Sequence, residues 1–232
     1  MMKLRHNSPS TIAPGIYPML YTFFDDQGAL RRDPFWVQVD ATFDAQAAGV
    51  AILGLGTEVS KLTYNERTEV LEVVAKRIDG RKALLVIVYG DTITEQIEFS
   101  KRATQSVASA LILQLPSQQM DDAKLADFFS EIIVAVDCPI GIQNASEYLG
   151  SGLSNQSLIA LATKHENFTI AKLECNAVNL QSVAEEMGDN VMLFNGRCGL
   201  ELTDNLRAGA SGLIPGLDTI HTIARRKQIF QT

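Results

Sequence analysis

The stretch ALLVIVYG, residues 83–90, is apolar along almost its whole length instead of alternating between apolar and polar residues. A strand of this kind is buried on both faces, which is typical of a parallel sheet covered by helices. Seven further short runs share the pattern, so eight strands are expected. They are GIYPMLYTFF (15–24), VAILGL (50–55), SALILQLP (109–116), PIGIQN (139–144), FTIAKLE (168–174), NVMLFNG (190–196) and SGLIPG (211–216).

The segments between these runs have apolar residues at helical spacing, most clearly at 34–48, 64–78 and 122–136. Asp33 before Pro34 predicts a helix start, and Thr63 with Glu66 forms a capping-box pattern at the start of another. Repeated strand–helix units without a composition break predict one α/β domain over residues 1–232, folded as a (β/α)8 TIM barrel. No GxGxxG follows the first strand, which disfavours a dinucleotide-binding sheet.

The two ends of the chain carry separate expectations. Residues 1–13 are expected to be flexible. Residues 217–232 are too few for more than one helix, so they are expected to form the remnant of an eighth helix, and the C-terminal helical region is either short or truncated.

Composition narrows the class of function. A net charge of −7 without a block of Lys or Arg argues against nucleic acid and anionic membranes as partners. No run approaches the ~18 apolar residues of a membrane span. The three cysteines are far apart and predict reduced thiols in the cytoplasm. The histidines have no neighbours at metal-ligand spacing, so no metal or cofactor is expected, and small-molecule chemistry is favoured.

One charge interrupts the apolar run FTIAKLE, and it belongs to Lys172. An ammonium moved into an apolar interior loses hydration, which favours the free amine, and an amine forms a Schiff base with a ketone. The structural alternative is a lysine that reaches solvent from a strand end, or pairs with Glu174 two residues along on the same face. The strand alone favours this structural role.

Four stretches in order change that balance: GIYPMLYTFFDDQGAL (15–30), GVAILGLGTEVSKLTYNER (49–67), PIGIQNASEYLG (139–150) and NFTIAKLEC (167–175). Together they resemble the family of dihydrodipicolinate synthase and N-acetylneuraminate lyase, Schiff-base-forming (β/α)8 lyases, from about Gly15 to Gly216. The resemblance implies that Lys172 forms the imine. It also implies a homodimer or homotetramer and a pyruvate-like 2-oxo acid as substrate. The substrate-binding residues that it suggests are Gly54, Leu55, Gly56, Thr57, Gln143, Asn144 and Ile214.

The sequence also departs from this family. Leu55 and Gly56 stand where the family usually has two hydroxyl residues. Gln143 stands at the place of the proton-transferring tyrosine, and an amide is neither a general acid nor a general base near pH 7. Tyr148 stands at the place of an arginine that holds the second substrate in the synthase. PSQQ (116–119) has no match to the tyrosine that the family supplies from a partner subunit. A working dihydrodipicolinate synthase is therefore not expected.

Two loop residues are candidates for the missing groups. Tyr148 is a candidate catalytic phenol, and its alternative is an aromatic residue packed on a helix or at a subunit contact. Arg197, between glycines in FNGRCGLEL (194–202), is a candidate for binding a carboxylate or a phosphate. Its alternative is an exposed ion pair with Glu201.

Three hypotheses remain open at this point. The first is a cytoplasmic lyase that uses Lys172 for aldol cleavage, condensation or dehydration of a deoxy-sugar acid or a related compound. The second is a non-catalytic ligand-binding or regulatory barrel of the same family. The third is a phosphate-dependent barrel enzyme that uses Arg197.

Overall fold

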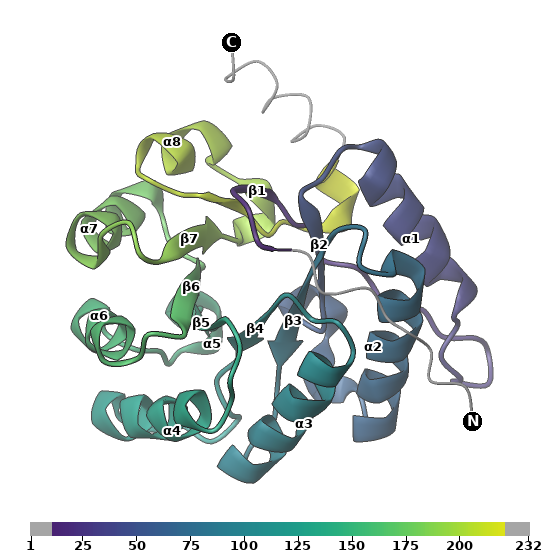
Figure 1. The fold of residues 1–232 in the computed structure, drawn as a ribbon, viewed down its shortest axis with the longest axis horizontal. Helices are drawn as coiled ribbons and strands as arrows, with labels where there is room; N and C mark the ends of the chain where they lie inside the picture. The colour runs from purple at the N-terminus through teal and green to yellow at the C-terminus, as the bar shows by residue number, and fades with distance from the viewer. Residues whose placement is uncertain (1–10, 221–232) are drawn as a thin grey trace.

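The computed structural model describes residues 11–220 and has eight parallel strands in one sheet, in the order β1-β8-β7-β6-β5-β4-β3-β2. Helices α1 to α4 and α6 to α8 form a ring around the strands (Figure 1). The strands are β1 (Gly15–Ile16), β2 (Gly49–Ile52), β3 (Ala83–Val88), β4 (Ala110–Leu113), β5 (Ile140–Asn144), β6 (Phe168–Leu173), β7 (Met192–Asn195) and β8 (Gly212–Leu213). The helices are α1 (Asp33–Asp44), α2 (Tyr64–Ile78), α3 (Ile93–Gln105), α4 (Asp122–Val134), α5 (Ser146–Leu149), α6 (Asn155–Lys164), α7 (Ala177–Met187) and α8 (Leu202–Arg207).

The sheet closes on itself between β1 and β2. Strand β1 pairs with β8 on one side. On the other side the backbone N–H of Leu20 donates to Ala51 O at 2.9 Å, and the N–H of Ala51 donates to Pro18 O at 2.9 Å. The expectation of a (β/α)8 barrel is therefore confirmed.

Local capping explains where helices begin. Thr63 and Glu66 form the predicted capping box at the start of α2, and Thr92 with Glu95 forms another at α3. Helix α1 begins at Asp33 as expected, but the Asp33 carboxylate binds Arg31 instead of capping the helix.

The first strand is shorter than the run 15–24 predicted. Strand pairing covers Gly15–Ile16, followed by isolated bridges at Met19 and a bridge between Phe24 and Leu30. Pro18 has no N–H to contribute to a continuous ladder, and the chain then leaves the sheet as a loop. Apolar character alone therefore overestimated the strand.

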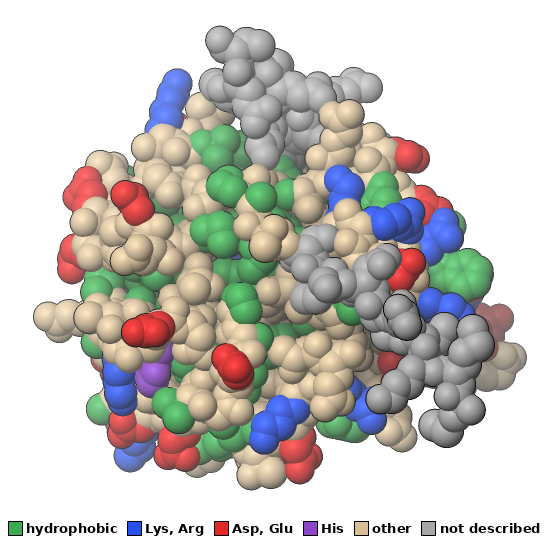
Figure 2. Space-filling view, in the orientation of Figure 1, with side chains coloured by type: hydrophobic (Ala, Val, Ile, Leu, Met, Phe, Trp, Pro, Cys, Tyr) green, Lys and Arg blue, Asp and Glu red, His purple; other side chains and the backbone are tan. Residues whose placement is uncertain are grey.

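The interior of the barrel is packed with side chains and is not an open pore. These residues are Tyr17, Met19, Ala51, Ala83, Leu85, Ile87, Ala110, Ile112, Ile170, Phe194 and Ile214. A second and larger core lies between the sheet and the helices. On the face shown in Figure 2, hydrophobic side chains gather toward the centre, and charged side chains lie mostly near the rim.

The expectations for the two ends of the chain fall mostly outside the described residues. Of the last sixteen positions the structure describes 217–220, where Leu217–Thr219 form one turn of 3-10 helix. Between residues 11 and 220, no helix is both long enough and apolar enough to cross a membrane.

Candidate active site

Lys172 lies near the C-terminal end of β6 and is 3% exposed. Side chains two residues apart on a strand share a face, so Lys172 points to the barrel interior like Ile170. Its ammonium nitrogen contacts the Glu174 carboxylate, and the two side chains are 4% and 8% exposed. The ion pair that the sequence offered as a structural alternative is therefore present, and it is buried.

A cavity of about 180 Å³ opens beside this ion pair. Its walls come from segments that follow the carboxyl ends of β1, β2, β5, β6, β7 and β8, which is where barrel enzymes place their active sites. The loop after β2 and the lysine meet at this end, as predicted. The lining residues are Met19, Tyr21, Leu55, Gly56, Tyr148, Lys172, Glu174, Arg197, Cys198, Ile214, Pro215 and Gly216.

Glu174 is held from two sides. One carboxylate oxygen contacts Lys172 Nζ, and the other accepts the backbone N–H of Arg197. A Cβ atom on Gly196 would lie 2.1 Å from Glu174 Oε1, so the space for the carboxylate depends on glycine at that position. Strand β6 and the loop after β7 thus fix the carboxylate against the lysine amine.

Gln143 lies opposite Lys172 in the register of β5 and β6. It is fully buried, and neither its Oε1 nor its Nε2 has a hydrogen-bond partner within residues 11–220. A buried amide without partners is destabilising, which makes such a group a candidate for binding a ligand. Gln143 does not line the cavity itself.

Arg197 lies at the mouth of the cavity with 21% of its side chain exposed. Its guanidinium is 3.4 Å from Glu201 and 3.8 Å from Glu147, so the predicted alternative of a pair with Glu201 is present. Burial alone would lower the pKa of Arg197, but its hydrogen bond with Tyr148 and the two carboxylates outweigh burial and raise it. The buried Nε has no partner among the described residues, whereas Tyr148 is 57% exposed.

Three predicted binding residues, Gly54, Thr57 and Asn144, do not line the cavity. The Thr57 hydroxyl donates to Leu20 O at 2.9 Å. A Cβ atom on Gly54 would lie 2.4 Å from the Met19 side chain. The Asn144 amide donates to Leu153 O at 2.9 Å and accepts the Leu153 N–H at 3.0 Å. Their positions in the motifs indicated that these residues lie near the site, but did not reveal the hydrogen-bond partners of their side chains.

Sequence reasoning missed several lining residues, most notably Tyr21. The Tyr21 hydroxyl donates to Asp218 at 2.5 Å, and burial together with Asp218 raises the pKa of Tyr21 to about 12. Its spacing of two from Met19, and of four from Tyr17, was a usable signal for the same interior face. Glu174 was recognised as a partner of Lys172 but not as part of a binding site.

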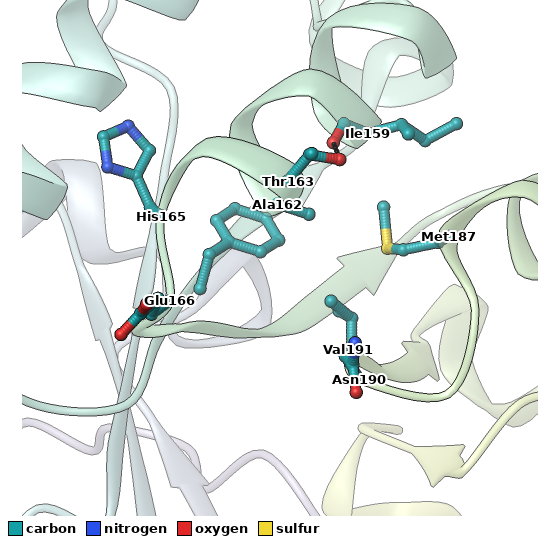
Figure 3. Close-up of a pocket in the computed structure, with 9 residues that line it drawn as sticks. Ile159, Ala162, Thr163, His165, Glu166, Met187, Asn190 and Val191 are labelled. Carbon is teal, nitrogen blue, oxygen red and sulfur yellow. Dashed lines mark hydrogen bonds between the residues drawn. The ribbon is translucent and has the colours of Figure 1, made fainter.

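A second cavity, of about 490 Å³, lies far from this chemistry. It is formed by the end of α6, the loop before β6, the end of α7 and the loop before β7 (Figure 3). It therefore lies at the amino ends of the strands, opposite Lys172. Among residues 11–220, no group of three His, Cys, Asp or Glu side chains is arranged to hold a metal ion.

The model of the dihydrodipicolinate synthetase family matches residues 13–231. The L-2-keto-3-deoxyarabonate dehydratase of Azospirillum brasilense is 27% identical over 210 residues, which are 87% of this chain and 67% of that protein. The 4-hydroxy-tetrahydrodipicolinate synthase of Methanopyrus kandleri is 27% identical over 185 residues, which are 78% of this chain and 62% of that protein.

A solved structure of Escherichia coli K12 YagE, described as a prophage protein of the dihydrodipicolinic acid synthase family in complex with pyruvate, superimposes with a TM-score of 0.88. The two chains are 22% identical, and the match covers 94% of this chain and 75% of that one. A likeness at this level of identity establishes the fold alone.

Proposed function

The chain belongs to the dihydrodipicolinate synthetase family, and from this premise we propose that it is a lyase that binds a 2-oxo acid as a Schiff base of Lys172. The observation that carries the proposal is a lysine that is 3% exposed and lines a small cavity at the carboxyl ends of the strands. The amine adds to the ketone carbon of the acid and water leaves. The resulting protonated imine accepts electrons during carbon–carbon cleavage or loss of a β-hydroxyl group.

The cavity supplies different contacts along its length. Leu55 and Gly56 line the side where the resemblance puts the substrate carboxylate, and Ile214 adds an apolar wall. Arg197 also lines the cavity, and its unpartnered Nε is a donor that suits a hydroxyl group of a longer substrate.

The proposed substrate class is a deoxy-sugar acid or a related 2-oxo acid, undergoing aldol cleavage, condensation or dehydration. The support is the similarity to a keto-deoxy-acid dehydratase and to a protein crystallised with pyruvate. The lysine-pathway condensation is not proposed, because Gln143 cannot replace a proton-transferring tyrosine and Tyr148 replaces the arginine that holds the second substrate. The arrangement also disfavours phosphate at Arg197, since Glu147 and Glu201 already face its guanidinium.

One observation favours a non-catalytic, ligand-binding barrel as the second candidate. The ion pair with Glu174 accounts for a buried Lys172 without any chemistry. Turnover distinguishes the two candidates, because a binding protein takes up the acid without converting it.

Borohydride reduction in the presence of pyruvate and a panel of deoxy-sugar 2-oxo acids, followed by intact mass and peptide mapping, tests the proposal. We expect one adduct per chain, located on Lys172 and absent from Lys172→Ala. Lys82 provides a control, because burial lowers the pKa of its amine, but this amine donates a hydrogen bond to Ala47 O near the amino end of β3, away from the cavity. An adduct that survives Lys172→Ala, or one that is lost in Lys82→Ala, contradicts the proposal.

We also propose a homodimer or homotetramer in a reducing, cytoplasmic environment. The support is family membership and three cysteines that are all free thiols. Light scattering that gives a 25.4 kDa monomer at micromolar concentration would refute the assembly.

A further inference from the structure

Resting on the proposed Schiff-base function, we propose that Glu174 is the proton-transfer catalyst of this site. It would take the place of the tyrosine whose position is occupied by Gln143. The carboxylate would serve twice, first during imine formation and then as the base that removes a proton from C3 of the bound acid.

Contact with the reacting nitrogen singles out Glu174. Within the described part of the chain, it is the titratable side chain in contact with Lys172 Nζ. The other titratable groups that line the cavity are less suitable. Tyr21 keeps its proton up to a pKa of about 12 and donates it to Asp218. Arg197 stays charged, Tyr148 is 57% exposed, and Cys198 is an exposed thiol.

The bonds of the intermediate bring its reacting atoms to the carboxylate. In the adduct, the oxygen on C2 and the carbon C3 are each two bonds from Nζ of Lys172. A carboxylate in hydrogen-bond contact with Nζ therefore lies within reach of both, which is the first requirement for a general acid or base. Gln143 shares this interior face but has no proton that it can exchange near pH 7.

The sequence of proton transfers balances. Glu174 takes a proton from the Lys172 ammonium, and the neutral amine then forms the N–C2 bond. The former carbonyl oxygen takes that proton from Glu174 and becomes a hydroxyl group. Glu174 next moves a proton from the nitrogen to this hydroxyl, which leaves as water and produces the iminium ion. The carboxylate then removes a C3 proton, the C–H electron pair becomes the C2=C3 double bond of the enamine, and the C2=N π pair moves to the nitrogen.

The surrounding structure keeps this carboxylate in place. The Arg197 N–H binds its second oxygen, and Gly196 leaves the space that it occupies. Arg197 and Cys198 adopt left-handed backbone conformations, with φ of 41° and 53°, in the turn that presents this N–H. Non-glycine residues rarely adopt such values, and they concentrate at functional sites.

The test separates imine formation from proton abstraction. Each variant is incubated with pyruvate, and two quantities are measured: the borohydride-trapped adduct at its end point, and the rate at which the C3 protons of pyruvate exchange with D2O by proton NMR. Exchange requires no second substrate. We expect Glu174→Gln to reach a trapped end point near that of the unmodified protein but to exchange C3 protons about 10²–10⁴ times more slowly. Glutamine keeps an acceptor for the Arg197 N–H, so the loop contact is retained.

Glu174→Asp keeps the carboxylate at a shorter reach and should recover part of the exchange rate. This variant decides the matter if circular dichroism shows that Glu174→Gln does not fold. Glu166→Gln is the control, because it removes a carboxylate beside the opposite cavity, and it should change neither quantity.

The outcomes are distinguishable. Failure of the unmodified protein to trap any 2-oxo acid overturns the Schiff-base function itself. Trapping without exchange in the unmodified protein, or exchange at the unmodified rate in Glu174→Gln, overturns the role of Glu174. Loss of exchange in Tyr148→Phe together with its retention in Glu174→Gln assigns proton transfer to Tyr148 instead.

Discussion

Replacing Lys172 by methionine should destabilise the protein through the charge that it leaves behind. Methionine fills much of the space of the lysine stem, so the main loss is the partner of the Glu174 carboxylate. With the two side chains only 4% and 8% exposed, the pair belongs to the buried class, in which removing one partner costs about 3–5 kcal/mol. The remaining hydrogen bond from the Arg197 N–H argues for the lower end, about 3 kcal/mol.

Urea unfolding followed by circular dichroism measures this cost, and in a chain of this size a loss of about 3 kcal/mol corresponds to a fall of roughly 6–12 °C in Tm. Adding Glu174→Gln to Lys172→Met removes the orphaned charge and should restore most of the lost stability. Lys61→Met is the control, because its pair with Glu58 has side chains 73% and 64% exposed and should contribute under about 1 kcal/mol. A cost below about 1 kcal/mol for Lys172→Met, or a double variant weaker than the single one, would falsify the buried-pair interpretation.

Three further outcomes are expected. Maleimide should modify Cys198 well before Cys138 or Cys175, since burial raises the pKa of both of the latter to about 11, and peptide mapping that shows the reverse order would contradict the structure. Burial and the charge of Lys164 lower the pKa of His165 below its ordinary 6.5, so the unfolded chain binds more protons and the free energy of unfolding should fall as the pH drops below about 6.5. Urea unfolding of the unmodified protein and of His165→Gln is compared between about pH 7.5 and about pH 5, a range that includes the ordinary histidine pKa. The free energy of unfolding should depend less on pH in His165→Gln, and an unchanged pH dependence rules out His165 as its source. Thr63→Ala removes the capping box of α2 and should cost about 1 kcal/mol in the same assay, whereas no change would mean that the cap is dispensable.

Much of the barrel was predictable because its strands are buried on both faces. Burial on both faces excludes polar residues from runs such as 83–90. Helix starts such as the one at Thr63 are recognisable because the capping residues Thr63 and Glu66 are only three positions apart in the sequence. The ends of strands were less predictable. Strand β1 stops after Ile16 because closure of the barrel, together with Pro18, decides which backbone groups pair.

The candidate site was predictable where strand periodicity alone decides direction. Alternation directs Lys172 and Glu174 to one face, and the motif order brings the loop after β2 to the same end. The use of polar atoms was not predictable. The side chains of Thr57 and Asn144 donate hydrogen bonds to the backbone carbonyls of Leu20 and Leu153, and the fold, not the local sequence, brings these partners close.

The paired hydrogen bonds between Asn144 and Leu153 have a consequence for how this protein could be diversified. They join the two ends of the segment that carries Tyr148, directly after β5. Gly152 permits this closure, since a Cβ there would lie 2.5 Å from Asn144 Oδ1. The segment from 145 to 151 is thus suited to loop grafting, in which a side chain that lines the cavity, such as Tyr148, can be changed while the two ends of the segment stay joined.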